Sequence, residues 1–149
     1  MIVAQVGFVV VGAWITHVDI REHRIPNRVV VPLAGGILVL CAVDAAASGS
    51  IDPLARGVAG ALVLGSVYGI LRAASRGALG GGDVKLAVPT GMLLAWDGWI
   101  PLLAGGGLAF LIGGVWSIGI LVTRRGNAAT AVAFGPFMVL GAVVGLAIT

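Results

Sequence analysis

The composition of this chain sets it apart from soluble proteins. It has 149 residues, of which 59% are hydrophobic and 10% carry a charge, whereas about 25% of the residues of a soluble domain are charged. This excludes an ordinary water-soluble globule, and the single cysteine, Cys41, excludes an internal disulfide and a cysteine-based zinc cluster. The net charge of +3 would suit nucleic acid in a soluble protein, but the basic residues are grouped in a few loops, and we expect no nucleic-acid partner.

The length fits a bundle of helices in a lipid bilayer. About 20 helical residues cross a bilayer core that is about 30 Å thick, so six crossings use about 120 residues and leave about 30 for loops. The sequence predicts an all-α, polytopic integral membrane protein, with residues 1–149 forming one transmembrane domain of about six helices. The predicted helices are Ile2–Val18, Val29–Val43, Leu54–Leu71, Val84–Trp96, Ile100–Val122 and Ala128–Ile148.

The basic residues indicate how these helices are oriented. All but Arg56 fall in the first, third and fifth connections, and loops rich in Lys and Arg stay in the cytoplasm. We therefore expect a multi-pass protein of the plasma (inner) membrane with both termini outside. On the outer side, Trp96 and Trp99 flank an Asp-Gly turn, where indole rings suit the interface. The residues of the three basic connections are Arg21, Arg24, Arg28, Arg72, Arg76, Lys85, Arg124 and Arg125.

Two glycine pairs have the spacing that lets membrane helices approach closely. Gly65 and Gly69 form one GxxxG pattern, and Gly141 and Gly145 form another. Packing between helices of the same chain is the expected use of both pairs, and a homodimer face is the alternative.

Two of the six acidic residues have no simple explanation as loop residues. Asp19 follows an apolar run, and Asp83 precedes a run of about 13 residues that spans only about 20 Å, so Asp83 is expected below the membrane surface. Carboxylates at that depth usually face a bundle interior or a water-filled cavity, although both residues could simply cap helix ends. The other acids are three turn residues on the outer side and one charge partner in a basic loop. They are Asp44, Asp52, Asp97 and Glu22.

A run of three glycines comes directly before Asp83. Gly80, Gly81 and Gly82 are expected to break the helix and expose backbone groups, which a membrane tolerates only where they line a cavity or are buried in protein. An extended glycine strand could also bind a peptide by backbone hydrogen bonds. The segment lacks the spacing of a phosphate-binding loop.

These segments together resemble a known family. Asp19-Ile20-Arg21 with Ile25-Pro26-Asn27, then Gly80 to Leu86 (GGGDVKL), then Phe134-Gly135-Pro136-Phe137 are similar, in order, to the signature blocks of the type IV prepilin peptidases, which are GxGD-type intramembrane aspartic proteases. The resemblance implies that Asp19 and Asp83 are the catalytic pair. It also implies a prepilin or pseudopilin substrate with a short basic leader and a hydrophobic helix, cleaved at the cytoplasmic face after a small residue such as glycine.

The chain departs from the larger bacterial members in one respect. Those members carry paired CxxC motifs in a cytoplasmic region linked to zinc binding and N-methylation, whereas this sequence has one cysteine. It is more similar to the short, stand-alone members, which serve Flp-type pili, related secretion systems or archaeal-type filaments, and N-methylation is not expected of it.

Hydrolysis by two acids needs neither a metal nor a cofactor. One carboxylate takes a proton from water, and one carboxylic acid protonates the scissile carbonyl, because mutual repulsion keeps one proton on the pair. Helix dipoles favour an ionised Asp83 at the start of its helix and a protonated Asp19 at the end of its own. The resemblance also marks supporting residues, which are Gly80, Gly81, Gly82, Lys85, Arg21, Pro26, Asn27, Gly135 and Pro136.

Each supporting residue has a simpler alternative. Lys85 does not share the helical face of Asp83 and is either a cation at the membrane interface or a substrate-orienting group. Pro26 and Asn27 suit the first turn of a helix, and Pro136 suits a kink in the last one.

Other functions remain open at this point. His17, Asp19 and His23 suggest a metal site, but no fourth ligand is in view. A presenilin-like protease shares the GxGD pattern but not the IPN and FGP blocks. Two acids in a membrane also suit a small proton-coupled transporter, and an inactive scaffold for pilus assembly is the remaining alternative.

Overall fold

The described part of the chain forms a bundle of six helices. The computed structural model describes residues 1–22, 25–75, 79–122 and 134–148, with the side chains of 120–122 excepted, and it contains no strand within them. The six helices predicted from the sequence are confirmed. They are α1 (Ile2–Glu22), α2 (Asn27–Ser48), α3 (Asp52–Ala74), α4 (Gly81–Asp97), α5 (Trp99–Val122) and α6 (Gly135–Ala147).

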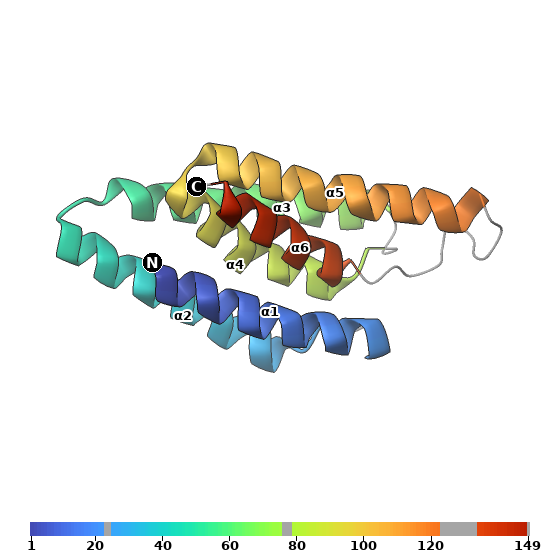
Figure 1. Ribbon diagram of the computed structural model, residues 1–149, viewed down its shortest axis with the longest axis horizontal. Coiled ribbons are helices and arrows are strands. Elements are labelled where there is room, and N and C mark those ends of the chain that lie inside the picture. The colour runs from blue at the N-terminus through green and yellow to red at the C-terminus, as the bar shows by residue number, and fades with distance from the viewer. Residues whose placement is uncertain (23–24, 76–78, 123–133, 149) are drawn as a thin grey trace.

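Successive helices run in opposite directions along the bundle. Figure 1 shows that α1, α3 and α5 end at one end of the molecule, where α2, α4 and α6 begin, and that the two termini lie toward the opposite end. Hereafter the first of these ends is called the site end. The alternation places three helix C-termini and three helix N-termini together at the site end.

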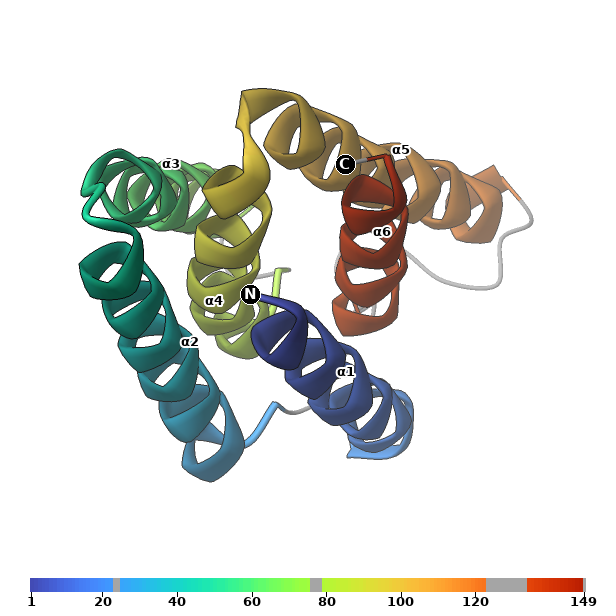
Figure 2. The same ribbon diagram turned by 60° about the vertical axis from the view of Figure 1, so that its left-hand side comes forward.

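The helix at the centre of the bundle is shorter than α1, α2, α3 and α5. α4 has 17 residues, which corresponds to about 25 Å, and it packs against α2, α3, α5 and α6. Figure 2 shows it surrounded by the other helices. Its residues from Gly91 to Trp96 are all buried, so protein rather than lipid surrounds most of its length.

The outer helices present an apolar surface. Among the described residues, α1, α2, α3 and Trp99–Gly119 of α5 are each long and apolar enough to cross a membrane. Large hydrophobic side chains such as Val3, Val31, Leu62 and Leu111 are exposed on them, which suits contact with lipid tails and would be costly in water. The fold is therefore that of a polytopic membrane protein, with α6 as a shorter apolar helix.

Glycines bring the helices into close contact. A Cβ on Gly60 of α3 would collide with the backbone of Gly91 of α4, and the reverse is also true. The predicted GxxxG pairs pack inside the chain as well: a Cβ on Gly65 would lie 3.3 Å from Val88 of α4, and one on Gly145 would lie 2.8 Å from the carbonyl oxygen of Pro101 in α5. Packing within the chain is thus confirmed, while a dimer stays an untested alternative.

Several predicted helix ends were wrong. α1 does not end at Val18 but continues to Glu22. The polar residues after Val18 belong to its last turn. Trp96, placed at the interface by its sequence position, is 6% exposed and belongs to the core, whereas Trp99 is 47% exposed. The start predicted for the last helix, at residue 128, lies outside the described residues; the described helix begins at Gly135.

Candidate active site

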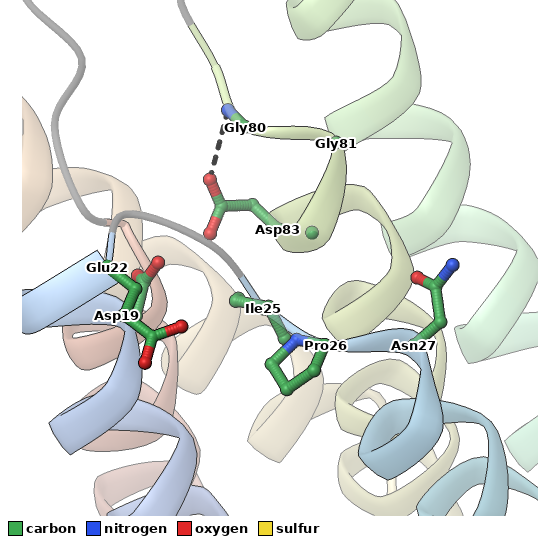
Figure 3. A pocket seen from close by; sticks show the side chains of 9 residues that line it. Asp19, Glu22, Ile25, Pro26, Asn27, Gly80, Gly81 and Asp83 are labelled. Atoms are coloured by element: carbon green, nitrogen blue, oxygen red, sulfur yellow. Dashed lines mark hydrogen bonds between the residues drawn. The ribbon is translucent and has the colours of Figure 1, made fainter.

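The residues of the first two signature blocks meet in one pocket at the site end. Its volume is about 350 Å³, and it lies where α1 ends and where α2 and α4 begin. Figure 3 shows the Asp19 and Asp83 side chains reaching this pocket from α1 and α4. The described residues that line it are Asp19, Glu22, Ile25, Pro26, Asn27, Gly80, Gly81, Gly82 and Asp83.

Asp83 is held by the backbone at the start of its own helix. It is the third residue of α4 and is 4% exposed. Its Oδ2 accepts a hydrogen bond of 3.1 Å from the N–H of Gly80, the residue that caps the helix. Such a bond satisfies one of the N–H groups that a helix leaves unpaired at its start and fixes the carboxyl group in place.

Asp19 is held by a different helix from its own. It lies in the last part of α1, is 4% exposed, and its Oδ2 accepts a hydrogen bond of 3.1 Å from the N–H of Gly135 at the start of α6. This bond brings the third signature block to the site. It also changes the expectation from helix dipoles, because both carboxyl groups now face a helix N-terminus, and dipoles no longer distinguish the acid from the base.

The glycine run is mostly helical, which corrects the expected extended strand. Only Gly80 is extended, with φ −62° and ψ 141°, and α4 begins at Gly81. Two glycines at the site leave space that a side chain would fill. A Cβ on Gly82 would lie 2.6 Å from Cβ of Ile25, and one on Gly135 would lie 2.8 Å from Oδ2 of Asp19, so the backbone comes close to its neighbours at both positions.

Lys85 and Asn27 connect the starts of two helices. Lys85 Nζ donates a hydrogen bond of 2.7 Å to Oδ1 of Asn27, which ties α4 to α2 beside the pocket. Pro26 precedes α2 with φ −72° and ψ 128°, so it ends the connection from α1 rather than forming the first turn. The described contact gives Lys85 a structural role in addition to the two alternatives raised by the sequence.

Four of the predicted supporting residues are not among the described residues that line the pocket, and Lys85 and Gly135 are two of them. Arg21 is exposed on α1, and Pro136 stands in the first turn of α6, a position where proline suits a helix. Neither belongs to the described lining of the pocket.

Two lining residues, Glu22 and Ile25, were not among the predicted site residues. Glu22 had been explained as a charge partner in a loop, yet it lies on α1 and lines the pocket with Asp19. The signal was available, because residues three apart share one face of a helix once α1 is known to continue. Ile25 follows α1 and fills the space against Gly82, a contact with no local pattern to reveal it.

The metal alternative of His17, Asp19 and His23 stays untested, because one of the three residues lies outside the described part of the chain. No group of three His, Cys, Asp or Glu residues within it is arranged to hold a metal ion. His17 is exposed on α1 and does not line the pocket, and His23 lies outside the described residues. What the pocket offers chemically is a pair of buried carboxyl groups that line the same cavity.

The sequence is similar to known proteins. Residues 6–122 match the type IV leader peptidase family. A protein of Escherichia coli (strain K12) named prepilin leader peptidase/N-methyltransferase is 34% identical over 139 residues, which cover 87% of this chain and 56% of that protein. Proteins of the same name from Stutzerimonas stutzeri and Aeromonas salmonicida (strain A449) are 29% and 28% identical, over 95% and 89% of this chain and 50% and 44% of theirs.

This chain therefore spans about half the length of the curated relatives that it matches. No solved structure matches it.

Proposed function

Because the chain belongs to the type IV leader peptidase family, we propose that it is a membrane aspartic endopeptidase that removes the leader of a type IV prepilin or a pseudopilin-like, Flp-type protein. The observation that carries the proposal is the pair of buried carboxyl groups, Asp19 and Asp83, on one pocket. Each is fixed by a backbone N–H, as catalytic groups must be to act on one bond.

The proposed chemistry uses the two acids in turn. The ionised carboxylate takes a proton from water, whose oxygen bonds to the scissile carbonyl carbon, while the protonated acid donates its proton to the carbonyl oxygen. When the tetrahedral intermediate collapses, the C–N bond breaks and the proton taken from water goes to the leaving amine, while one hydroxyl proton of the intermediate returns to the carboxylate that had acted as the acid. No cofactor takes part, and either aspartate suits either role.

The charge of the pocket supports a basic leader as the substrate segment. Three of its described lining residues are acidic, namely Asp19, Glu22 and Asp83, and none of the described lining residues is basic. A pocket of one charge sign attracts the opposite charge and raises the rate of encounter. The apolar outer helices offer the hydrophobic helix of such a substrate a path within the lipid bilayer.

We place the site at the cytoplasmic face of the plasma (inner) membrane, with both termini outside. The support is the clustering of basic residues in the connections at the site end, which follows the positive-inside rule. Arg21, Arg28, Arg72 and Lys85 are the described members of that cluster, and Arg56 lies in the first turns of α3 toward the other end.

The test is cleavage of a prepilin by the purified protein in detergent. We expect Asp19→Asn and Asp83→Asn each to lower the rate by at least about 100-fold, because each change keeps the size of the side chain and removes its proton chemistry. Both variants should accumulate in the membrane like the unmodified protein. Asp97→Asn is the matched control, since Asp97 lies at the far end of α4 and accepts a hydrogen bond of 2.9 Å from Gln5 that Asn can still accept.

Three outcomes would contradict the proposal. If either Asp→Asn variant cleaves prepilin at the full rate, the aspartate that it replaces does not take part in catalysis. Cleavage that EDTA abolishes and zinc restores would replace the metal-free mechanism. No cleavage of any candidate prepilin by the unmodified protein would leave the transporter and the pilus-assembly scaffold as the better interpretations.

A further inference from the structure

The peptide unit between Leu79 and Gly80 is held on both sides. Its N–H, which belongs to Gly80, donates to Oδ2 of Asp83 over 3.1 Å. Its carbonyl oxygen, which belongs to Leu79, accepts a hydrogen bond of 2.6 Å from Nη1 of Arg72. One rigid, planar group therefore connects the guanidinium of Arg72 with the carboxyl of Asp83.

Residues at the end of α3 fix this peptide unit from outside α4. Arg72 lies in the last turn of α3, and its neighbour Ser75 accepts a hydrogen bond of 3.3 Å from the N–H of Leu79. Both the oxygen and the nitrogen of Leu79 are thus bound to the end of α3. Because α3 packs closely along α4 through Gly60 and Gly91, the end of α3 is a fixed neighbour of Leu79 and Gly80.

The start of α4 leaves room for the guanidinium. A Cβ on Gly81 would lie 3.4 Å from both Cζ and Nη1 of Arg72, so the guanidinium lies directly against the backbone of the first helical residue. A side chain at Gly81 that extends beyond Cβ would compete with the guanidinium for this space. A Cβ alone would fit beside the guanidinium in ordinary van der Waals contact.

We propose that Arg72 is a positioning residue for Asp83, acting through the Leu79–Gly80 peptide unit; the inference rests on the proposed function. A charged donor on the carbonyl oxygen polarises the peptide group and strengthens its N–H as a donor, since hydrogen bonds in a chain reinforce one another. It also fixes the plane of the group and hence the direction of that N–H. Asp83 thereby keeps the position that it needs opposite Asp19.

The experiment compares Arg72→Met and Arg72→Lys in purified protein with a prepilin substrate. Arg72→Met keeps an apolar stem and removes the donor, and we expect kcat to fall about tenfold to 100-fold, as it does when a catalytic group is misplaced, with KM unchanged. Arg72→Lys keeps a cationic donor and should recover most of the lost rate. Arg28→Met is the matched control, because it removes an exposed cation at the site end and should keep the rate of the unmodified protein.

The outcomes separate this inference from the proposed function. If the unmodified protein cleaves prepilin and Arg72→Met keeps the same kcat, the inference is wrong and the function stands. A higher KM with unchanged kcat would make Arg72 a substrate-binding residue and would also overturn it. If Arg72→Met fails to accumulate, Arg72→Ala is assayed with added ethylguanidinium: recovery of kcat supports the inference, and no recovery contradicts it.

Discussion

The two aspartates have the same local surroundings although they come from opposite parts of the chain. Each is buried, and each accepts a hydrogen bond from a glycine N–H at the start of a helix: Gly80 before α4 and Gly135 in α6. Glycine suits both positions because a Cβ added to either glycine would lie only 2.8 Å from the carboxyl oxygen that its N–H binds. At the scale of single residues, the site therefore depends on two glycine backbones that approach the two carboxyl groups closely.

The close contact between Gly82 and Ile25 predicts the effect of adding one methyl group at Gly82. We expect Gly82→Ala to displace the connection between α1 and α2, because the new Cβ would lie 2.6 Å from Cβ and 3.2 Å from the backbone nitrogen of Ile25. The cost should be about 1–3 kcal/mol of stability, as for other overpacked positions, together with a loss of cleavage. Thermal unfolding in detergent and a prepilin cleavage assay measure the two effects.

The matched control for this change is Gly36→Ala. A Cβ there would meet nothing within 4 Å, so its stability should equal or slightly exceed that of the unmodified protein, since alanine favours the helix. Equal stability and activity of Gly82→Ala and Gly36→Ala would mean that the contact with Ile25 does not constrain the site.

Among the helices, α3 and α4 form the closest association that bears on the site. Gly60 and Gly91 touch through their backbones, and at one end of this pair Arg56 of α3 donates to the carbonyl oxygen of Ala95 over 2.7 Å. At the other end Arg72 donates to Leu79. α4 is thus fixed along its length and at both ends by one neighbour, which gives Asp83 a rigid base.

A methyl group between these helices should separate them. We expect Gly91→Ala to lower stability by about 1–3 kcal/mol or more, because its Cβ would lie 2.8 Å from the carbonyl carbon of Gly60 and 2.9 Å from Cβ of Leu64, and neither can move easily. Thermal unfolding in detergent measures the change. Gly107→Ala serves as the control, since nothing lies within 4 Å of its Cβ; a melting temperature for Gly91→Ala equal to that of the control would show that the contact is loose.

Across the whole molecule, the alternation of six helices brings the acids together. Asp19 is near the end of the first helix and Asp83 is near the start of the fourth, so an antiparallel order places both at the same end. The same order places the termini at the opposite end. Which end faces the cytoplasm is decided by the charges of the connections and not by the packing.

Cysteine labelling tests this orientation. After replacement of the buried Cys41 by alanine, Ser75→Cys at the site end should react only with reagents that reach the cytoplasm, and Ser48→Cys only with reagents outside. Both serines are exposed and stand at the ends of α3 and α2. The reverse labelling would put Asp19 and Asp83 on the wrong face for prepilin cleavage. A third cysteine expected to label from the cytoplasm, at Arg125, lies outside the described residues.

The sequence by itself determined the class of protein, the number of helices and the identity of the catalytic candidates. Apolar runs of membrane length are local features, and the GGGD segment with Asp19 is specific enough to indicate a family. It could not determine where helices end at the site, because α1 continues through polar residues to Glu22 and the last glycines of the run join α4.

Only the tertiary structure decided how the site is held. The N–H of Gly135 reaches Asp19 across 116 residues of sequence, Ile25 packs against Gly82, and Trp96 is buried instead of lying at the interface. These contacts depend on which helices become neighbours and how closely their backbones approach. No periodicity or local propensity encodes that choice, because it is made by the packing of the whole bundle.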